Sequence, residues 1–164
     1  MYPQAYAPGA SSANQATSAA NNEGDYFREY EMQFIVNKTV NNSTHAGEEY
    51  WLLGGDTNSR SRKDNWYYKH ADDDTRFLPH DVILEQTNLK DVIADRYPAG
   101  NYFMSSTYGA ARIDILYASP AMFNLMTNST TLTDEWTSLL PSWSYYTSFR
   151  DPSDHRPILV DFKL

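Results

Sequence analysis

The chain of 164 residues contains no cysteine, so it has neither a disulfide framework nor a thiolate metal site. It also lacks long apolar runs, and no stretch approaches the roughly 20 apolar residues that a membrane-spanning helix needs. Residues 1–8 lack the basic segment and apolar run of a signal peptide. We therefore expect a soluble protein without a transmembrane segment. The compartment stays open, including an extracytoplasmic location of the parent protein.

Positive charge is scarce, because 13 Lys and Arg residues stand against 21 Asp and Glu residues, for a net charge of −8. Contacts from Lys and Arg to phosphates supply most non-specific affinity for nucleic acids, so this balance disfavours a DNA-coating role. Aromatic residues are abundant at 15%, with 13 tyrosines, and the hydrophobic share of 41% is that of a globular protein. The length fits one domain or part of one.

The N-terminal part divides into a polar lead-in and a helix. Residues 1–24 are rich in Ala, Ser, Pro, Asn and Gln, which predicts a loop or disordered lead-in, so the folded part is expected to span residues 25–164. An amphipathic helix is predicted from Asp25, available as its cap, to about Val40. The residues expected on one face of this helix are Phe27, Tyr30, Phe34 and Val40. Residues 81–93 predict one helix or two short ones.

Three short apolar segments predict strands. Residues 50–53 form an unbroken apolar run that ends at Gly54-Gly55, which predicts a strand buried on both faces. Residues 112–117 predict a second strand and residues 157–162 a closing one. Residues 124–152 are rich in Thr, Ser, Trp and Tyr and predict a long irregular loop.

Each predicted strand has a polar motif at or beside one end: Gly55-Asp56-Thr57-Asn58, Arg112-Ile113-Asp114 and Ser153-Asp154-His155-Arg156-Pro157. Taken singly, such a motif is explained by turn chemistry, because Gly, Asp and Asn favour the turn after a strand. Together the motifs would bring acidic groups to one rim of a sheet, where ligand sites in layered α/β folds tend to lie. A buried Asp114 would be costly unless it is paired, and His155 is its natural partner.

In this order the three motifs resemble the endonuclease/exonuclease/phosphatase family, which includes deoxyribonuclease I-like nucleases, abasic-site endonucleases, inositol polyphosphate 5-phosphatases and neutral sphingomyelinases. The resemblance covers about residues 25–164. It implies an α/β fold, a four-layer sandwich of two β-sheets flanked by helices. It also implies that only the C-terminal half of this domain is present, because the family's first β-layer, its metal-binding Glu and a His motif would precede Met1.

The resemblance further implies a phosphoester hydrolase (phosphodiesterase, nuclease or phosphatase) in which water attacks a phosphoryl group with the help of Mg²⁺ or Mn²⁺. Asp56 would orient or deprotonate the water, and Asn58 would donate its amide to a phosphoryl oxygen or hold the water. His155 would act as general base or as a cationic stabiliser, with Asp114 accepting a hydrogen bond from its ring. Asp154 would be the metal ligand.

Other polar and aromatic residues receive no assigned role. Three further histidines lie in polar sequence and are expected to be exposed: His45, His70 and His80. The run Asp72-Asp73-Asp74 lacks the ligand spacing of a calcium loop and predicts a solvated face. Arg112 and Arg156 would contact phosphate or, more commonly, lie at strand edges as solvated cations. The aromatic residues between 136 and 149 are a substrate wall or a packing element.

Two rival functions stay open. In the first, the chain is a catalytically incomplete half-domain that acts as an interaction or ligand-binding module, and an uncovered apolar sheet face would favour self-association or pairing with an N-terminal half. In the second, the aromatic segment binds a sugar or a lipid. For an enzyme, the partner is a phosphoester: a small molecule, a lipid head group or nucleic acid. The acidic charge favours a small or membrane-derived phosphoester over duplex DNA.

Overall fold

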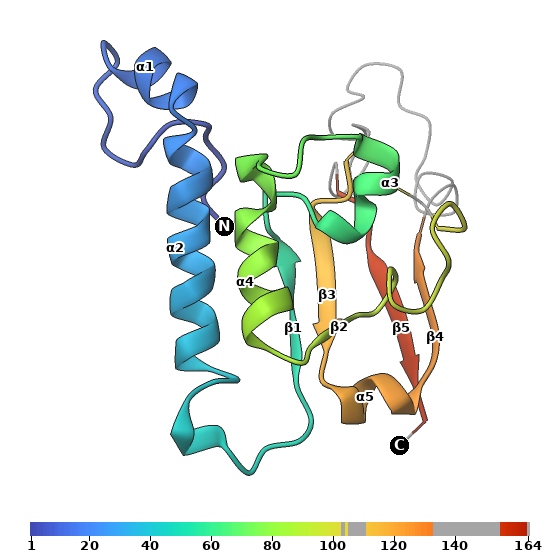
Figure 1. Cartoon of the computed structure of the whole chain (residues 1–164). Coiled ribbons are helices and arrows are strands. Elements are labelled where there is room, and N and C mark those ends of the chain that lie inside the picture. Colours follow the sequence, from blue (N-terminus) through green and yellow to red (C-terminus); the bar gives the residue numbers. More distant parts are fainter. Residues whose placement is uncertain (103, 105–110, 133–154, 164) are drawn as a thin grey trace, which may run out of the picture.

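The computed structural model describes residues 1–102, 104, 111–132 and 155–163, in which helices combine with two small antiparallel sheets. The helices are α1 (Gln15–Ala20), α2 (Glu23–Lys38), α3 (Asn65–Tyr68), α4 (Leu78–Gln86) and α5 (Pro120–Leu125), with single 3₁₀ turns η1 (Ser43–His45), η2 (Arg62–Asp64) and η3 (Thr75–Phe77). The strands are β1 (Leu52–Asp56), β2 (Lys90–Asp91), β3 (Asp114–Ala118), β4 (Met126–Thr131) and β5 (Ile158–Phe162). Helices α2 and α4 lie side by side next to the sheet that contains β1 and β3 (Figure 1).

The sheets are defined by their pairing register. The first has the order β1-β3-β2, and β1 runs antiparallel to β3 with Leu52 opposite Ala118 and Asp56 opposite Asp114. The second consists of β4 and β5, which pair antiparallel with a register shift between Met126 and Asn128. In the first sheet, therefore, the last residue of β1 meets the first residue of β3.

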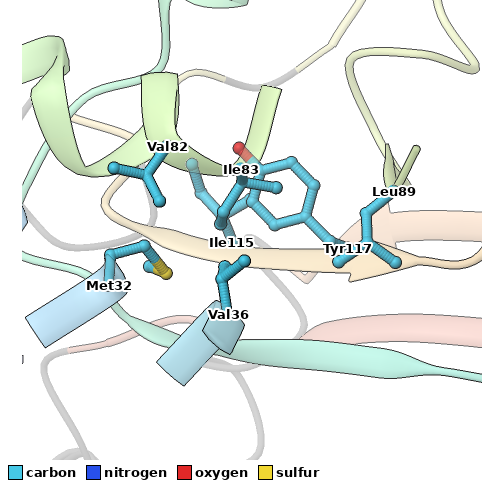
Figure 2. Close-up of a cluster of buried hydrophobic side chains, with 7 residues drawn as sticks. All are labelled: Met32, Val36, Val82, Ile83, Leu89, Ile115 and Tyr117. Atoms are coloured by element: carbon cyan, nitrogen blue, oxygen red, sulfur yellow. The ribbon is translucent and has the colours of Figure 1, made fainter. Parts of the chain in front are cut away.

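Strand β3 divides the core by the alternation of its side chains. One set faces the helices, and its buried cluster contains Met32, Val36, Val82, Ile83, Leu89, Ile115 and Tyr117 (Figure 2). The alternate residues Leu116 and Ala118 pack with the second cluster, which includes Ile158 and Val160 of β5. Because successive side chains of a strand point to opposite faces, Asp114 shares the face of Leu116, toward β5.

The expected strand at residues 50–53 exists, but it is shifted along the chain and is not buried on both faces. Strand β1 begins at Leu52, whose side chain is 46% exposed, and it pairs with β3 alone among the described strands. The strand continues through Gly54, where a Cβ atom would lie 2.7 Å from Leu116 Cδ1. Both glycines belong to β1, and close packing on β3 disfavours a side chain at Gly54, whereas a Cβ atom at Gly55 would meet nothing within 4 Å.

Helix α2 confirms the expected helix with ends shifted by two residues, but its inner face differs from the expected one. Tyr30 and Phe34 are more than half exposed, whereas Met32 and Val36 are buried against α4 and β3. Asp25 lies inside the first turn, where its carboxylate pairs with Arg28 instead of capping the helix. The sequence expectation placed one or two helices at residues 81–93. Only the first part is helical, and the remainder contains the short strand β2.

Residues 1–24 include a helix, α1, as well as loop, and the segment before it docks on the start of α2. Arg28 Nη1 donates to the carbonyl oxygens of Tyr2 (3.0 Å) and Gln4 (2.8 Å). At Gly24 a Cβ atom would lie 2.2 Å from the Gln4 oxygen, so only glycine permits this approach. The lead-in is thereby held against the folded part.

The expected loop at residues 124–152 is wrong for its first part, because α5 ends at Leu125 and β4 follows directly. Residues 133–154, with the whole aromatic segment and Asp154, lie outside the described residues. Strands β3 and β5 agree with the expected strands at residues 112–117 and 157–162 to within two residues. In the described part of the chain, no helix is both long enough and apolar enough to cross a membrane.

Candidate active site

A histidine and an aspartate from distant segments meet at the start of β3. His155 Nδ1 lies 2.7 Å from Asp114 Oδ2, with the imidazole 33% and the carboxylate 18% exposed. Asp114 faces β5 because of the alternation in β3, and His155 stands just before β5. An ionised carboxylate only accepts, so Nδ1 carries the hydrogen in this contact and Nε2 is the basic nitrogen of the neutral ring. The expected partnership of the two residues is confirmed as a contact.

Asp56 and Asn58 form a tight turn at the end of β1. The Asn58 backbone N–H donates to Asp56 Oδ1 at 2.9 Å, and its side-chain Nδ2 donates to Asp56 Oδ2 at 3.0 Å. Asn58 has φ of 48°, a left-handed conformation that Asn adopts more readily than most residues. Nδ2 also donates to the Met1 carbonyl oxygen at 3.2 Å. The Asp56 carboxylate thus fixes the orientation of the Asn58 amide.

The strand register brings these two pairs together. Asp56 is the register partner of Asp114, and directly opposite residues of an antiparallel pair have Cβ atoms about 5 Å apart. The link continues past the strand end, since the Thr57 N–H donates to the Ile113 carbonyl oxygen at 2.8 Å. Four of the five residues expected in the site, Asp56, Asn58, Asp114 and His155, are therefore gathered at one end of β1 and β3. The fifth, Asp154, lies outside the described residues.

His80, on α4, contacts Thr57 of this turn. This corrects the expectation that His80 lies exposed in a loop. It is fully buried on α4, with Nε2 3.0 Å from Thr57 Oγ1 and Nδ1 2.8 Å from the Tyr117 hydroxyl. The Thr57 hydroxyl donates its hydrogen to the Ile113 carbonyl oxygen at 2.7 Å, so it accepts from an Nε2–H of His80. Burial, assisted by the charge of Arg112, lowers the pKa of His80 to about 3, so the ring is neutral.

The sequence holds a weak signal for this role of His80. It stands three residues before Ile83, a spacing that puts both on one face of a helix, and Ile83 is a core residue. Thr57 stands between the two expected site residues of its motif.

Arg112 is neither a phosphate ligand nor a solvated cation, so both expectations for it are wrong. Its side chain is 1% exposed and binds two carboxylates, Asp64 through Nε and Nη2 (both 3.0 Å) and Asp91 through Nη1 (3.1 Å) and Nη2 (2.7 Å). Burial acts to lower the pKa of Arg112, but the two carboxylates outweigh it and raise the pKa above its usual value. Arg112 is therefore a structural cation two residues before Asp114.

The other polar residues considered in the sequence have varied surroundings. Asp72 and Asp73 are exposed as expected, whereas Asp74 caps η3 and pairs with Arg76, whose hydrogen bonds lower the pKa of Asp74 to about 2. His45 and His70 are half-buried instead of exposed. Three hollows lined by described residues adjoin the site, and one of about 290 Å³ is lined by Asp56 and Thr57. A groove of about 380 Å³ is lined by Asp114 and Arg156, and a pocket of about 490 Å³ is lined by Asn58.

The donor atoms at the site suit a hard cation. Asp56 and Asp114 offer carboxylate oxygens, which Mg²⁺ and Mn²⁺ prefer over nitrogen and sulfur. No group of three or more His, Asp or Glu side chains placed to hold a metal occurs among the described residues, a set that excludes Asp154. A comparison with models of known protein families finds no match for this chain, and neither does a comparison with curated proteins.

Proposed function

We propose that the chain carries part of the active site of a metal-dependent phosphoester hydrolase of the endonuclease/exonuclease/phosphatase type. The observation that supports this most is the 2.7 Å contact between His155 and Asp114 at a strand end directly opposite Asp56. A carboxylate that holds an imidazole by Nδ1 is the arrangement hydrolases use to fix the tautomer and increase the basicity of a catalytic histidine.

Each residue of the chain has a role in this proposal. His155 accepts a proton at Nε2 from the attacking water or, once protonated, stabilises charge on the phosphate, and Asp114 holds its ring. Asp56 orients the water. Asn58 donates from Nδ2 to a phosphoryl oxygen in exchange for its longer bond, the 3.2 Å contact to Met1. Asp154 would hold Mg²⁺ or Mn²⁺, which would supply positive charge to the phosphoryl oxygens.

The proposed fold is the deoxyribonuclease I-like sandwich, of which this chain forms one half. The layer of α2 and α4 against the β1-β3-β2 sheet supports this (Figure 1). The second sheet, β4-β5, packs on the opposite face of β3 through Leu116 and Ala118. Half of such a sandwich requires a helical layer on one face of a sheet and apolar packing on its other face.

The test is hydrolysis of bis-p-nitrophenyl phosphate and p-nitrophenyl phosphate with Mg²⁺ or Mn²⁺, and again with EDTA. Removal of a general base lowers rates by about 10²- to 10⁴-fold, so His155→Ala should lose nearly all activity. Asp114→Asn should lose much of it, because the ring is then held by a weaker acceptor. His45→Ala is the matched control, because His45 pairs with Glu48 and lines a pocket with Trp51 and Ser119, at the opposite end of β1 and β3 from Asp56 and Asp114. Full activity in His155→Ala would refute the proposal.

A second candidate function is a ligand-binding or interaction module that does not hydrolyse phosphoesters. The Asn58 amide favours this function. Both of its N–H groups already donate within the chain, to Asp56 and Met1, so neither is free for a phosphoryl oxygen. Exposed apolar residues such as Leu52 on β1 would then favour self-association. Ligand binding that survives Asp56→Ala and EDTA, together with a dimer in size-exclusion chromatography, would support this function over the first.

A further inference from the structure

A polar pocket opens beside Asn58, between the start of α2 and η3. Its volume is about 490 Å³, and three arginines line it: Arg28, Arg60 and Arg76. Since Asn58 lines the same pocket, a ligand at the proposed catalytic end could extend into it. The Cα atoms of residues two apart are separated by about 7 Å at most, so one small ligand can contact both Asn58 and Arg60.

Two of the three arginines are already neutralised. Arg28 pairs with Asp25 and donates to backbone carbonyl oxygens, and Arg76 pairs through Nε and Nη2 with Asp74. Arg60 differs from both. In the part of the chain that the structure describes, no carboxylate lies within ion-pair distance of Arg60, and its guanidinium stacks 4.8 Å above the Tyr68 ring. The Arg60 guanidinium is thus positioned by Tyr68, and its charge is available to an anionic ligand.

His70 lies between two of these arginines, Arg60 and Arg76. Its Nε2 lies 2.9 Å from Arg60 Nη1, and its Nδ1 lies 3.2 Å from Arg76 Nη2. A guanidinium only donates, and a neutral imidazole has a single accepting nitrogen, so one of these contacts sets two donors against each other. Rotating the ring does not help, because an arginine faces each side. The carboxylate of Asp74 lies 3.9 Å from Nδ1, beyond hydrogen-bond distance. Burial and then the charge of Arg76 lower the pKa of His70, so protonation does not resolve the conflict either.

An anionic oxygen bound by Arg60 would remove this conflict, because the guanidinium would donate to it and His70 could then accept from Arg76 alone. Such charge-assisted hydrogen bonds are the stronger ones in proteins, and the planar fork of Arg matches a phosphate. The carboxylate of Asp73 also lines the pocket, but it is exposed, and solvent and salt screen exposed charges.

We propose that this pocket binds a second phosphoryl group of the substrate through Arg60, which lines it. This proposal rests on the proposed function, because the ligand is a substrate only if the chain hydrolyses phosphoesters. It assigns to the chain a ligand with two phosphoryl groups on neighbouring positions, one at Asn58 and one at Arg60. A short stretch of nucleic-acid backbone and a small bisphosphate share this chemistry.

The experiment is calorimetric titration of the full chain with inorganic pyrophosphate, in EDTA so that no hydrolysis occurs. The wild type should give saturable binding in the millimolar range or tighter. Arg60→Gln should weaken it about tenfold or more, the loss expected for charge-assisted hydrogen bonds, and Arg60→Lys should recover part. Arg62→Gln is the matched control with the same change of charge, because Arg62 pairs with Asp81 outside the pocket. Circular dichroism verifies that each variant is folded.

The outcomes separate this site from the catalytic proposal. No binding by the wild type, or equal losses in Arg60→Gln and Arg62→Gln, would overturn the site even if the chain hydrolyses bis-p-nitrophenyl phosphate. Arg60-dependent binding by a chain without hydrolytic activity would uphold the anion site and count against the enzyme. Titration with 5′-phosphorylated dithymidylate and with a polyol bisphosphate then identifies the source of the phosphates. Each ligand is compared with the same compound carrying one phosphate. If the second phosphate does not tighten binding, or tightens it equally in Arg60→Gln, the proposal of a second phosphoryl group is refuted.

Discussion

Replacing Arg112 by Met should destabilise the chain strongly and in a pH-dependent manner. The substitution keeps an unbranched side chain of similar length but removes the only cation that contacts Asp64 and Asp91 in the described residues. Both carboxylates have 0% exposed side chains, so water cannot replace the lost contacts. Two buried negative charges would remain beside a neutral thioether.

The magnitude follows from what each carboxylate keeps. Asp64 still accepts from the Tyr102 hydroxyl at 2.8 Å, and Asp91 still accepts from the backbone N–H groups of Ile93 (2.9 Å) and Ala94 (3.0 Å). Removing one partner of a buried ion pair costs about 3–5 kcal/mol, and these remaining bonds should keep the loss within that range. A domain has a total stability of about 5–15 kcal/mol, so the variant should fold marginally.

The pH dependence has a definite sign. Burial already raises the pKa of Asp64, against the opposing charge of Arg112. For Asp91, burial has the same tendency, but the charge and hydrogen bonds of Arg112 outweigh it and keep the pKa below its usual value. Without Arg112 both carboxyls should titrate higher in the folded chain than in the unfolded one. An acid whose folded pKa is raised is destabilising above its unfolded pKa, and the penalty shrinks as pH falls through the folded value.

The measurement is urea unfolding followed by tryptophan fluorescence, for wild type and Arg112→Met, at pH 8 and pH 5. The difference in unfolding free energy should be largest at pH 8 and smaller at pH 5. Adding Asp64→Asn to the variant should recover part of the loss at pH 8, because it removes one of the two uncompensated charges. A loss below about 1 kcal/mol, or the same loss at both pH values, would refute the reasoning that the network is a buried ion cluster.

Two further predictions concern the turn at Asp56 and the N-terminal segment. The folded chain keeps His80 neutral with a pKa of about 3, whereas the unfolded chain takes up this proton below about pH 6.5, so acid favours unfolding by about 1.4 kcal/mol per pH unit between these values. His80→Gln should remove this part of the slope in urea unfolding from pH 7 to pH 4, and an unchanged slope would contradict it. Gly24→Ala would set a Cβ atom 2.2 Å from the Gln4 oxygen, so the segment before α1 should detach, with a stability loss of about 1–3 kcal/mol. Limited proteolysis should then cut within the first ten residues faster than in wild type, and equal cleavage rates would contradict the contact.

The sequence predicts those parts of the fold and site whose signals are local. Strand β3 and β5 agree with the apolar segments that predicted them, because a short β-rich run next to turn residues needs no remote information. The pairing of Asp114 with His155 could also be expected, since a carboxylate inside an apolar strand requires a partner. The turn at Asp56 follows the same logic, with glycine and asparagine at positions that demand them.

The sequence could not predict what depends on partners brought in from far along the chain. Arg112 reads as a surface cation until Asp64 and Asp91, 48 and 21 residues before it, are known to surround it. His80 is a polar residue next to Asp81 in sequence, and only the packing of α4 on β3 brings it to Thr57 and buries it. The inner face of α2 differs from the expected one for a related reason, because residues of α4 and β3 bury Met32 and leave Tyr30 exposed.

The alternation along β3 ties the assembly of the site to a count of residues. Asp114 points toward His155 only because an even number of steps separates it from Leu116 and Ala118, which pack on β5. Adding a single residue between Asp114 and Ile115 would rotate the carboxylate to the side of α2 and α4, while every core residue kept its place. Adding two would return it to the original side, one pleat farther out. The site is therefore sensitive to the parity of an insertion more than to its size.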